Sequence, residues 1–234
     1  MDQIKAVIFD MDGVLIDAKE WHYEALNRAL GNYGYSITRS EHISIYDGLP
    51  TRSKLQLLTE RNDFPEELHE SVNKQKQQYT LEIAREKCQP RLAHTDALEW
   101  LKNAGFSVGV ASNSIRATVD MMLDKAGVLE YFDFTLSNED VSHPKPHPEI
   151  YQTAISRLQL KPAECLVVED HQYGVDAARQ AGAHVLQVNT VDEVCRSRIS
   201  DFISRLESSP VLGPLPHGSK QNTSSKTTTL GKAA

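Results

Sequence analysis

Short apolar runs recur along the chain, and the segments between them have apolar residues spaced as on one face of a helix. The first run covers residues 6–9, and four later ones are residues 108–111, 134–136, 166–168 and 185–188. Uninterrupted runs of this kind are typical of parallel strands covered on both faces. The segments with helical spacing are residues 97–104, 117–126, 149–158 and 174–181. This alternation predicts an α/β fold, a parallel sheet with helices on both faces.

The interval between residues 17 and 90 lacks this alternation and is rich in Glu, Lys, Gln and Leu. Its apolar residues recur at helical spacing, for example Leu26 with Leu30 and Leu55 with Leu58. We therefore predict a small all-helical domain at residues 18–89, inserted into an α/β core made of residues 1–17 and 90–206. Residues 207–234 have little to bury, and we expect them to form a disordered tail.

Two carboxylates, Asp10 and Asp12, directly follow the first apolar run. In open α/β sheets the ligand crevice lies beyond the carboxyl ends of the strands. Two ionised carboxylates about 4 Å apart repel by roughly 4 kcal/mol at an effective dielectric constant near 20, so such a pair favours a bound cation. Mg²⁺ suits these oxygen ligands. An incidental turn after a strand is the alternative interpretation.

Polar residues also follow two later runs. Ser112, Asn113 and Ser114 offer groups suited to phosphate oxygens, and Glu169 with Asp170 forms a second acidic pair. Taken singly, the first group could be a helix N-cap and the second a solvated loop. Their shared position at the ends of predicted strands favours one common site.

Lys145 lies in the segment His-Pro-Lys-Pro-His-Pro, residues 143–148. The flanking prolines restrict the backbone there, so the ammonium group has a defined position. An ordinary lysine of a turn is the alternative. Together with the acidic pairs, Lys145 could complete one cleft.

These motifs occur in the order found in the haloacid dehalogenase superfamily of phosphohydrolases, which the chain resembles over roughly residues 4–190. It is most similar to the branch with a helical cap after the first motif, which includes beta-phosphoglucomutase and phosphoglycolate phosphatase. The resemblance implies a Rossmann-like α/β core with a small all-helical cap domain. It also implies a Mg²⁺-dependent phosphatase that hydrolyses a small phosphorylated metabolite, such as a sugar phosphate, through an aspartyl-phosphate intermediate.

The resemblance assigns a role to each acidic residue. Asp10 would be the nucleophile and a metal ligand. Asp12 would protonate the leaving group, later deprotonate water, and contact the metal through its backbone carbonyl. Asp170 would complete the Mg²⁺ sphere, and Glu169 would bind the ion directly or orient a water beside it.

The phosphoryl group is expected to lie opposite these acids. Ser112, Asn113 and the amides that follow would hold its oxygens at the start of a helix. Lys145 would neutralise their charge.

Four residues of the predicted helical domain are candidate substrate contacts. His22 matches a histidine of beta-phosphoglucomutase-like proteins and would assist proton transfer or position the substrate, although a partly buried helix histidine is the alternative. Gly48 permits a tight turn in a loop resembling the substrate-specificity loop of the family, and Arg52 could grip a phosphate or carboxylate or be a surface charge. Lys76 could reach the substrate, but its charge run otherwise fits a solvated helix face.

Two departures from the mutase favour simple hydrolysis. Ala18 stands where the mutase has a threonine, and Ile115, followed by Arg116, stands where it has a lysine. A mutase must retain and rebind a bisphosphate intermediate, and both losses weaken that ability. A beta-phosphoglucomutase-like sugar phosphomutase is the alternative. Phosphonate hydrolysis lacks an evident Schiff-base lysine, and a non-catalytic metabolite-binding regulator is disfavoured because every chemical position is present.

The composition of the chain limits the classes of partner that it can have. The net charge of −7 over 234 residues argues against nucleic acid as a partner. No apolar stretch is long enough for a membrane span or a signal peptide. Three widely spaced cysteines fit a reducing compartment better than a disulfide framework. We therefore expect a cytoplasmic protein, a monomer or weak dimer, whose partner is a small phosphorylated metabolite.

Overall fold

Within residues 3–208, which the computed structural model describes, five parallel strands form one sheet. They are β1 (Ala6–Phe9), β2 (Ser107–Ala111), β3 (Phe134–Leu136), β4 (Cys165–Glu169) and β5 (His184–Gln187). Their order across the sheet is β3-β2-β1-β4-β5, and every neighbouring pair is parallel. The parallel sheet expected from the apolar runs is confirmed, with β1 at its centre.

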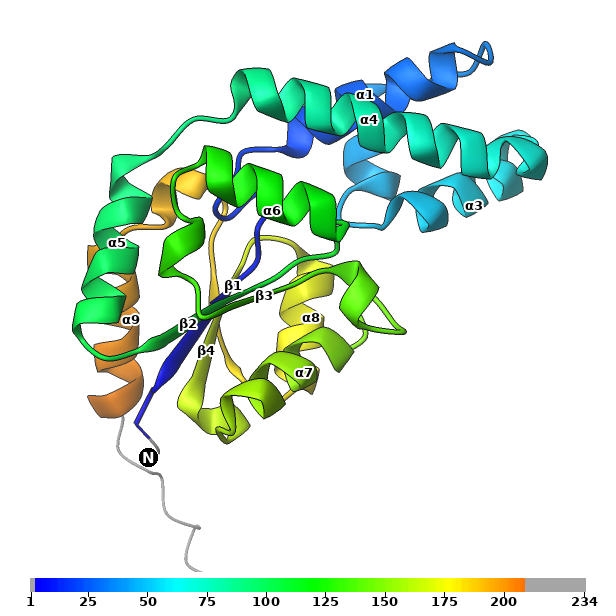
Figure 1. Cartoon of the computed structure of the whole chain (residues 1–234). Coiled ribbons are helices and arrows are strands. Elements are labelled where there is room, and N and C mark those ends of the chain that lie inside the picture. The colour runs from blue at the N-terminus through cyan, green and yellow to red at the C-terminus, as the bar shows by residue number, and fades with distance from the viewer. Residues whose placement is uncertain (1–2, 209–234) are drawn as a thin grey trace, which may run out of the picture.

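Helices cover both faces of the sheet (Figure 1). On β1, Val7 and Phe9 join one apolar cluster, and Ala6 and Ile8 join the other. The first cluster lies under α5 (Leu92–Asn103), α6 (Arg116–Lys125) and α9 (Arg196–Ser208), and the second under α7 (Glu149–Leu158) and α8 (Gln172–Gln180). Because both faces are buried, the central strands are apolar along their length. Short helical turns complete the core: η3 (Leu129–Tyr131), η4 (Asn138–Asp140), η5 (Pro162–Glu164) and η6 (Val191–Glu193).

The predicted element bounds agree with the structure at β1, β3 and α7 and differ elsewhere. Helix α5 begins at Leu92, ahead of the expected start at residue 97. Helix α9 was not expected, and its last two residues, Glu207 and Ser208, contradict the prediction that the tail begins at residue 207. Ile199 and Ile203, one helical turn apart, are buried in the first cluster and hold α9 against the core. The rest of the predicted tail, residues 209–234, lies outside the described residues.

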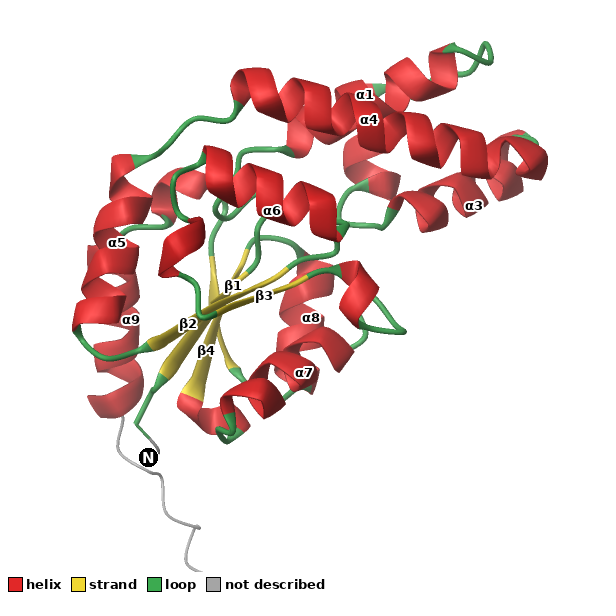
Figure 2. Ribbon diagram, in the orientation of Figure 1, coloured by secondary structure: helices red, strands yellow, loops and turns green. Residues whose placement is uncertain are grey.

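Between the core segments, residues 18–89 contain helices and no strand (Figure 2). We call this segment the helical insertion. Its elements are α1 (Lys19–Gly31), α2 (Arg39–Glu41), η1 (His42–Tyr46), α3 (Thr51–Asn62), η2 (Glu66–Leu68) and α4 (His69–Lys87). They surround an apolar cluster of their own, which includes Leu26, Leu30, Leu55, Leu58 and Val72.

The helical insertion lies beyond the carboxyl ends of the strands (Figure 1). The end of α4 is fixed to the core, because Ala84 and Cys88 join the first apolar cluster and Cys88 Sγ lies 3.5 Å from the carbonyl oxygen of Met122. All three cysteines of the chain are free thiols. No helix in the described part of the chain combines the length and apolarity needed to cross a bilayer.

Candidate active site

The parallel register of the sheet brings Asp10 and Glu169 to the same edge. Phe9 pairs with Val110 of β2 and with Val168 of β4, so the next residue of each strand lies at the carboxyl end. The backbone N–H of Asp10 donates to the carbonyl of Val168 at 2.9 Å and fixes this alignment. The predicted meeting of strand ends at one site is therefore present.

A tight turn follows Asp10 and positions Asp12. The carbonyl of Met11 accepts hydrogen bonds from the backbone N–H groups of Leu15 and Ile16, both at 2.9 Å. Gly13 has φ of +91°, and a Cβ there would lie 2.2 Å from Asp170 Oδ2. Glycine is thus required both by the left-handed backbone and by the close approach of Asp170.

The Lys145 ammonium group is buried at the centre of the site, with three acceptors. It donates to Asp10 Oδ1 at 2.6 Å, to Glu169 Oε1 at 2.6 Å and to the carbonyl of Ala111 at 2.8 Å. Burial alone would lower the pKa of Lys145, but the two carboxylates outweigh it and raise the pKa above its ordinary value. The lysine is therefore a fixed positive charge beside Asp10.

Glu169 is held by protein donors on both of its oxygens. Oε1 accepts from Lys145 and from the Tyr151 hydroxyl at 2.7 Å, and Oε2 accepts from the backbone N–H of Asp170 at 3.1 Å. A Cβ on Gly174 would lie 1.7 Å from Oε1, so the start of α8 packs directly on this carboxylate. These contacts direct Glu169 towards Lys145 and Tyr151.

Asp10, Glu169 and Asp170 offer carboxylate oxygens within 4.8 Å of one another. Burial raises the pKa of Asp10 well above its ordinary value, and the charges of Glu169 and Asp170 add to the effect while Lys145 opposes it. Burial also raises the pKa of Asp170. So much buried negative charge favours a cation between the carboxylates, and their hard oxygen atoms suit Mg²⁺. The donor set fits the divalent ion expected from the sequence.

The Asp12 carboxylate is not part of this cluster and contacts Ser114 and the helical insertion. Ser114 Oγ donates to Asp12 Oδ2 at 2.7 Å, and His22 Nε2 lies 3.0 Å from Asp12 Oδ1. Burial raises the pKa of Asp12, but His22 and Ser114 together lower it below its ordinary value. Lys76 Nζ lies 3.1 Å from His22 Nδ1, and burial together with this ammonium lowers the pKa of His22. A neutral histidine that donates from Nε2 and accepts at Nδ1 satisfies both contacts.

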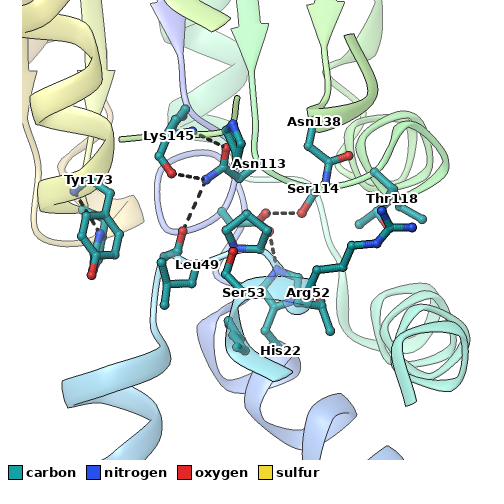
Figure 3. A pocket seen from close by; sticks show the side chains of 18 of the residues that line it. His22, Leu49, Arg52, Ser53, Asn113, Ser114, Thr118, Asn138, Lys145 and Tyr173 are labelled. Carbon is teal, nitrogen blue, oxygen red and sulfur yellow. Dashed lines mark hydrogen bonds and ion pairs between the residues drawn. The ribbon is translucent and has the colours of Figure 1, made fainter. Parts of the chain in front are cut away.

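A cavity of about 540 Å³ separates the strand ends from the helical insertion. Figure 3 shows His22 and Arg52 on the side of the insertion, across from Asn113, Ser114 and Lys145. The predicted site residues that line it are Asp10, Asp12, His22, Gly48, Arg52, Lys76, Asn113, Lys145, Glu169 and Asp170. Its volume suits a small metabolite.

Ser112 differs from the other predicted site residues because it does not line this cavity. Its side chain is buried, with the residue 1% exposed, and Oγ accepts from the backbone N–H of Ser114 at 3.0 Å. The neighbouring Ser114 lines the cavity instead. In this structure Ser112 shapes the turn that presents Ser114.

Asn113 connects the helical insertion to the segment that carries Lys145. Its Oδ1 accepts from the backbone N–H of Lys145 at 3.0 Å, while Nδ2 lies 3.3 Å from the carbonyl of Lys145 and 3.4 Å from the carbonyl of Gly48. Gly48 has φ of +71°, and a Cβ there would lie 2.5 Å from His171 Nδ1. The insertion therefore contacts the core through a glycine that admits no side chain.

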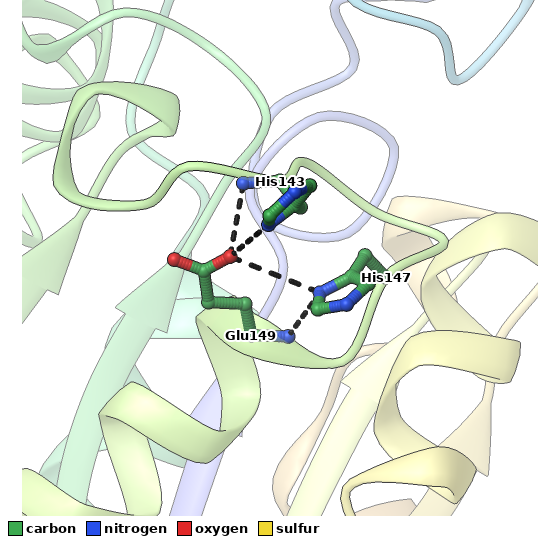
Figure 4. A group of neighbouring side chains, drawn as sticks. All are labelled: His143, His147 and Glu149. Carbon is green, nitrogen blue, oxygen red and sulfur yellow. Dashed lines mark hydrogen bonds and ion pairs between the residues drawn. The ribbon is translucent and has the colours of Figure 1, made fainter.

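His143 and His147 lie two residues before and after Lys145 in the sequence, and their side chains lie beside that of Glu149 (Figure 4). Glu149 accepts from the backbone N–H groups of Ser142 at 2.8 Å and His143 at 3.0 Å, and from His143 Nδ1 at 2.8 Å. The three side chains could together hold a metal ion. Their existing bonds already explain the arrangement, because the carboxylate closes the turn that leads to Lys145.

Several residues of the site were not predicted from the sequence. Lys19 Nζ lies 2.7 Å from Asp170 Oδ2, and its only sequence signal is its position shortly after the first motif. Tyr151 belongs to an apolar helix face, which gives no indication that its hydroxyl binds Glu169. Lys54 lies one helical turn before Leu58, on a helix face whose apolar spacing predicts only core residues.

A family model described as haloacid dehalogenase-like hydrolase matches residues 7–188. A phosphorylated carbohydrates phosphatase of Thermotoga maritima is 33% identical over 182 residues, which cover 76% of this chain and 82% of that protein. A fructose-1-phosphate phosphatase of Escherichia coli is 28% identical over 187 residues, which cover 80% of this chain and 97% of that protein.

Solved structures show the same fold. The crystal structure of a beta-phosphoglucomutase from Clostridium difficile matches with a TM-score of 0.76 and 23% identity. The match covers 88% of this chain and 100% of that one. At this identity the likeness concerns the fold alone, which agrees with the Rossmann-like core inferred from the motifs.

Proposed function

Because this chain belongs to the haloacid dehalogenase-like hydrolases, we propose that it is a Mg²⁺-dependent phosphatase of a small phosphorylated metabolite, acting through a phosphoryl group carried on Asp10. The observation that carries the proposal is the contact between Asp10 and the fully bonded Lys145 ammonium group at the edge of the cavity. The names of the relatives, a carbohydrate phosphatase and a fructose-1-phosphate phosphatase, support a sugar phosphate as substrate.

Asp10 would attack the phosphorus atom of the ester. An Asp10–phosphorus bond forms, the bond from phosphorus to the ester oxygen breaks, and that oxygen takes a proton from Asp12. Water then attacks the phosphorus of the aspartyl phosphate, gives its proton to Asp12 and releases inorganic phosphate with Asp10 restored. The lowered pKa of Asp12 means that this residue is a carboxylate before the ester binds, so a proton must reach it before it can act as the acid of the first step.

The metal site would consist of Asp10, Asp170 and the backbone carbonyl of Asp12. When bound, Mg²⁺ supplies positive charge that neutralises phosphoryl oxygens and lowers their repulsion of the attacking carboxylate. The prediction that Glu169 is a direct ligand stays open, but its bonds to Lys145 and Tyr151 support a role in positioning that lysine. Lys145 and Ser114 would face the phosphoryl group from the core.

The surroundings of Arg116 support hydrolysis over mutase chemistry. Arg116 bonds to Thr135 Oγ1 at 2.6 Å and to Asp140, so it cannot take the place of the lysine that a mutase has next to it. Ala18 is fully buried and offers no polar group.

The proposed activity is tested by measuring released phosphate across a panel of sugar phosphates and p-nitrophenyl phosphate. We expect turnover in Mg²⁺ and none in EDTA, restored when Mg²⁺ is added back. Mg²⁺ should also raise the melting temperature, because a ligand that binds only the folded state stabilises it. Conversion of glucose 1-phosphate to glucose 6-phosphate without phosphate release would replace the proposal by a mutase, and no turnover on any ester would refute it.

Substituting Gly48 by alanine should weaken substrate binding. A Cβ at this positive φ costs about 1–2 kcal/mol, and it would also push against His171 at the cavity wall. We expect KM to rise at least fivefold in steady-state phosphate release. Gly34→Ala is the matched control, because φ is +79° there and nothing lies within 4 Å of the added atom. Equal KM changes in the two variants would contradict this role of Gly48.

A further inference from the structure

Lys54 is a buried cation that the proposed mechanism does not use. It lies on α3, is 6% exposed and lines the cavity. Within residues 3–208, no hydrogen bond or ion pair involves its ammonium group. Two of its neighbours on the helix, Leu55 and Leu58, belong to the core of the helical insertion. A buried charge without a partner is costly, so its retention beside a cavity indicates a ligand.

Lys76 adds a second buried ammonium group on the same side of the cavity. It lies on α4, is 9% exposed, and its hydrogen-bond partner is the neutral His22. Burial and the charge of Lys54 lower the pKa of Lys76 to about 7, and burial lowers the pKa of Lys54 to about 8. Asp47 and Asp12 attract Lys54, but neither carboxylate lies within ion-pair distance of it. The helical insertion thus presents positive charge that the protein itself does not compensate.

The phosphoryl position on the core side does not account for these two lysines. There the ammonium group that contacts Asp10 and Glu169 belongs to Lys145, which comes from the core. Lys54 and Lys76 come from two helices of the insertion instead. The cavity is large enough for a small metabolite to extend from the strand ends to α3 and α4.

We propose that Lys54, together with Lys76, binds a second anionic group of the substrate, a carboxylate or a phosphate at the end that is not transferred. This inference rests on the proposed phosphatase function and narrows its substrate class to phosphate esters with two anionic ends. Such a group gives the Lys54 ammonium the charged acceptor that the protein does not provide. A neutral sugar end leaves that ammonium unpaired, so we expect selectivity against esters whose other end carries no charge.

The test compares substrates that differ in the second anion: fructose 1,6-bisphosphate with fructose 1-phosphate, and 6-phosphogluconate with glucose 6-phosphate. In wild type, we expect kcat/KM to be at least tenfold higher for the anionic member of at least one pair. Lys54→Met keeps an unbranched side chain of nearly the same length and removes its charge. It should raise KM for the preferred anionic member at least tenfold and change kcat/KM of its partner less than twofold.

Lys74→Met is the matched control, because Lys74 is an exposed lysine of the same helix as Lys76. It should leave both pairs unchanged. Melting temperature is a readout independent of turnover: Lys54→Met should melt higher than wild type without ligand, and the anionic member of the preferred pair should stabilise wild type more than the variant. If no ester is hydrolysed, the phosphatase proposal fails, while these melting shifts still decide whether the second anion site exists.

Two results would overturn the second anion site. One is that the wild-type protein prefers the anionic member of neither pair, whether measured by kcat/KM or by the shift in melting temperature. The other is a Lys54→Met variant that weakens both members of a pair equally, which would place Lys54 at the transferred phosphoryl group or in the fold alone.

Discussion

Asp10→Asn is expected to abolish phosphate release while leaving the metal-free protein at least as stable as the parent. Asparagine lacks the charged oxygen that attacks phosphorus, and removal of a covalent nucleophile costs about 10⁴-fold or more in kcat. Its amide oxygen still accepts the Lys145 hydrogen bond, so the local geometry is preserved. Single-turnover and steady-state phosphate assays measure the loss.

The stability result follows from the raised pKa of Asp10. The folded state holds the Asp10 proton more tightly than the unfolded chain, because burial and the neighbouring carboxylates disfavour the charge. The parent therefore loses stability as the pH rises from about 4, the ordinary pKa of aspartate, through the folded-state value. Asparagine has no such loss. Urea unfolding in EDTA at pH 4.5 and pH 7 should show the difference between variant and parent growing with pH, and a variant that unfolds more easily at pH 7 would contradict the account.

Lys145→Met is expected to abolish activity as well, but with the opposite effect on stability. Without the ammonium group, Asp10 and Glu169 remain buried with no cation between them, and the carbonyl of Ala111 loses its donor. Removing one partner of a buried ion pair costs about 3–5 kcal/mol in the free energy of unfolding. Urea denaturation in EDTA measures the cost.

Lys102→Met provides the comparison for Lys145→Met. Lys102 pairs with Asp133 at 2.5 Å, but both side chains are partly exposed, so its loss should cost less than about 1 kcal/mol. Similar losses in the two methionine variants would mean that the Lys145 cluster is not the stabilising centre inferred here. A stable Lys145→Met protein with normal turnover would refute both its structural and its catalytic role.

The sequence predicted the acidic edge of the sheet because that edge depends on local patterns. Apolar runs predicted the strands, and residues directly after a parallel strand must lie at its carboxyl end, as Asp10 and Asp170 do. The helix α9 escaped prediction because its buried face rests on few apolar residues, chiefly Ile199 and Ile203. The tail boundary was wrong for the same reason.

The partners of the cavity residues could not be predicted, because they depend on how separate helices pack. Lys76 has the spacing of a solvated charge run, yet the packing of α1 against α4 places it on His22. Lys54 and Tyr151 occupy helix faces rich in apolar residues, and helical periodicity does not distinguish a core side chain from one whose polar end lines a cavity, as in Lys54, or bonds a buried carboxylate, as in Tyr151. Ser112 fits the motif, but only the fold shows that its neighbour Ser114 lines the cavity.

The Asn113 side chain couples the helical insertion to the segment that carries Lys145. Its side-chain amide contacts the carbonyl of Gly48, in the helical insertion, and the backbone of Lys145 at the same time. Any movement of the Gly48 turn away from the core would break its contact with Asn113, while the amide would keep its contacts with the backbone of Lys145. The same amide therefore ties the position of the helical insertion to the segment that holds the ammonium group.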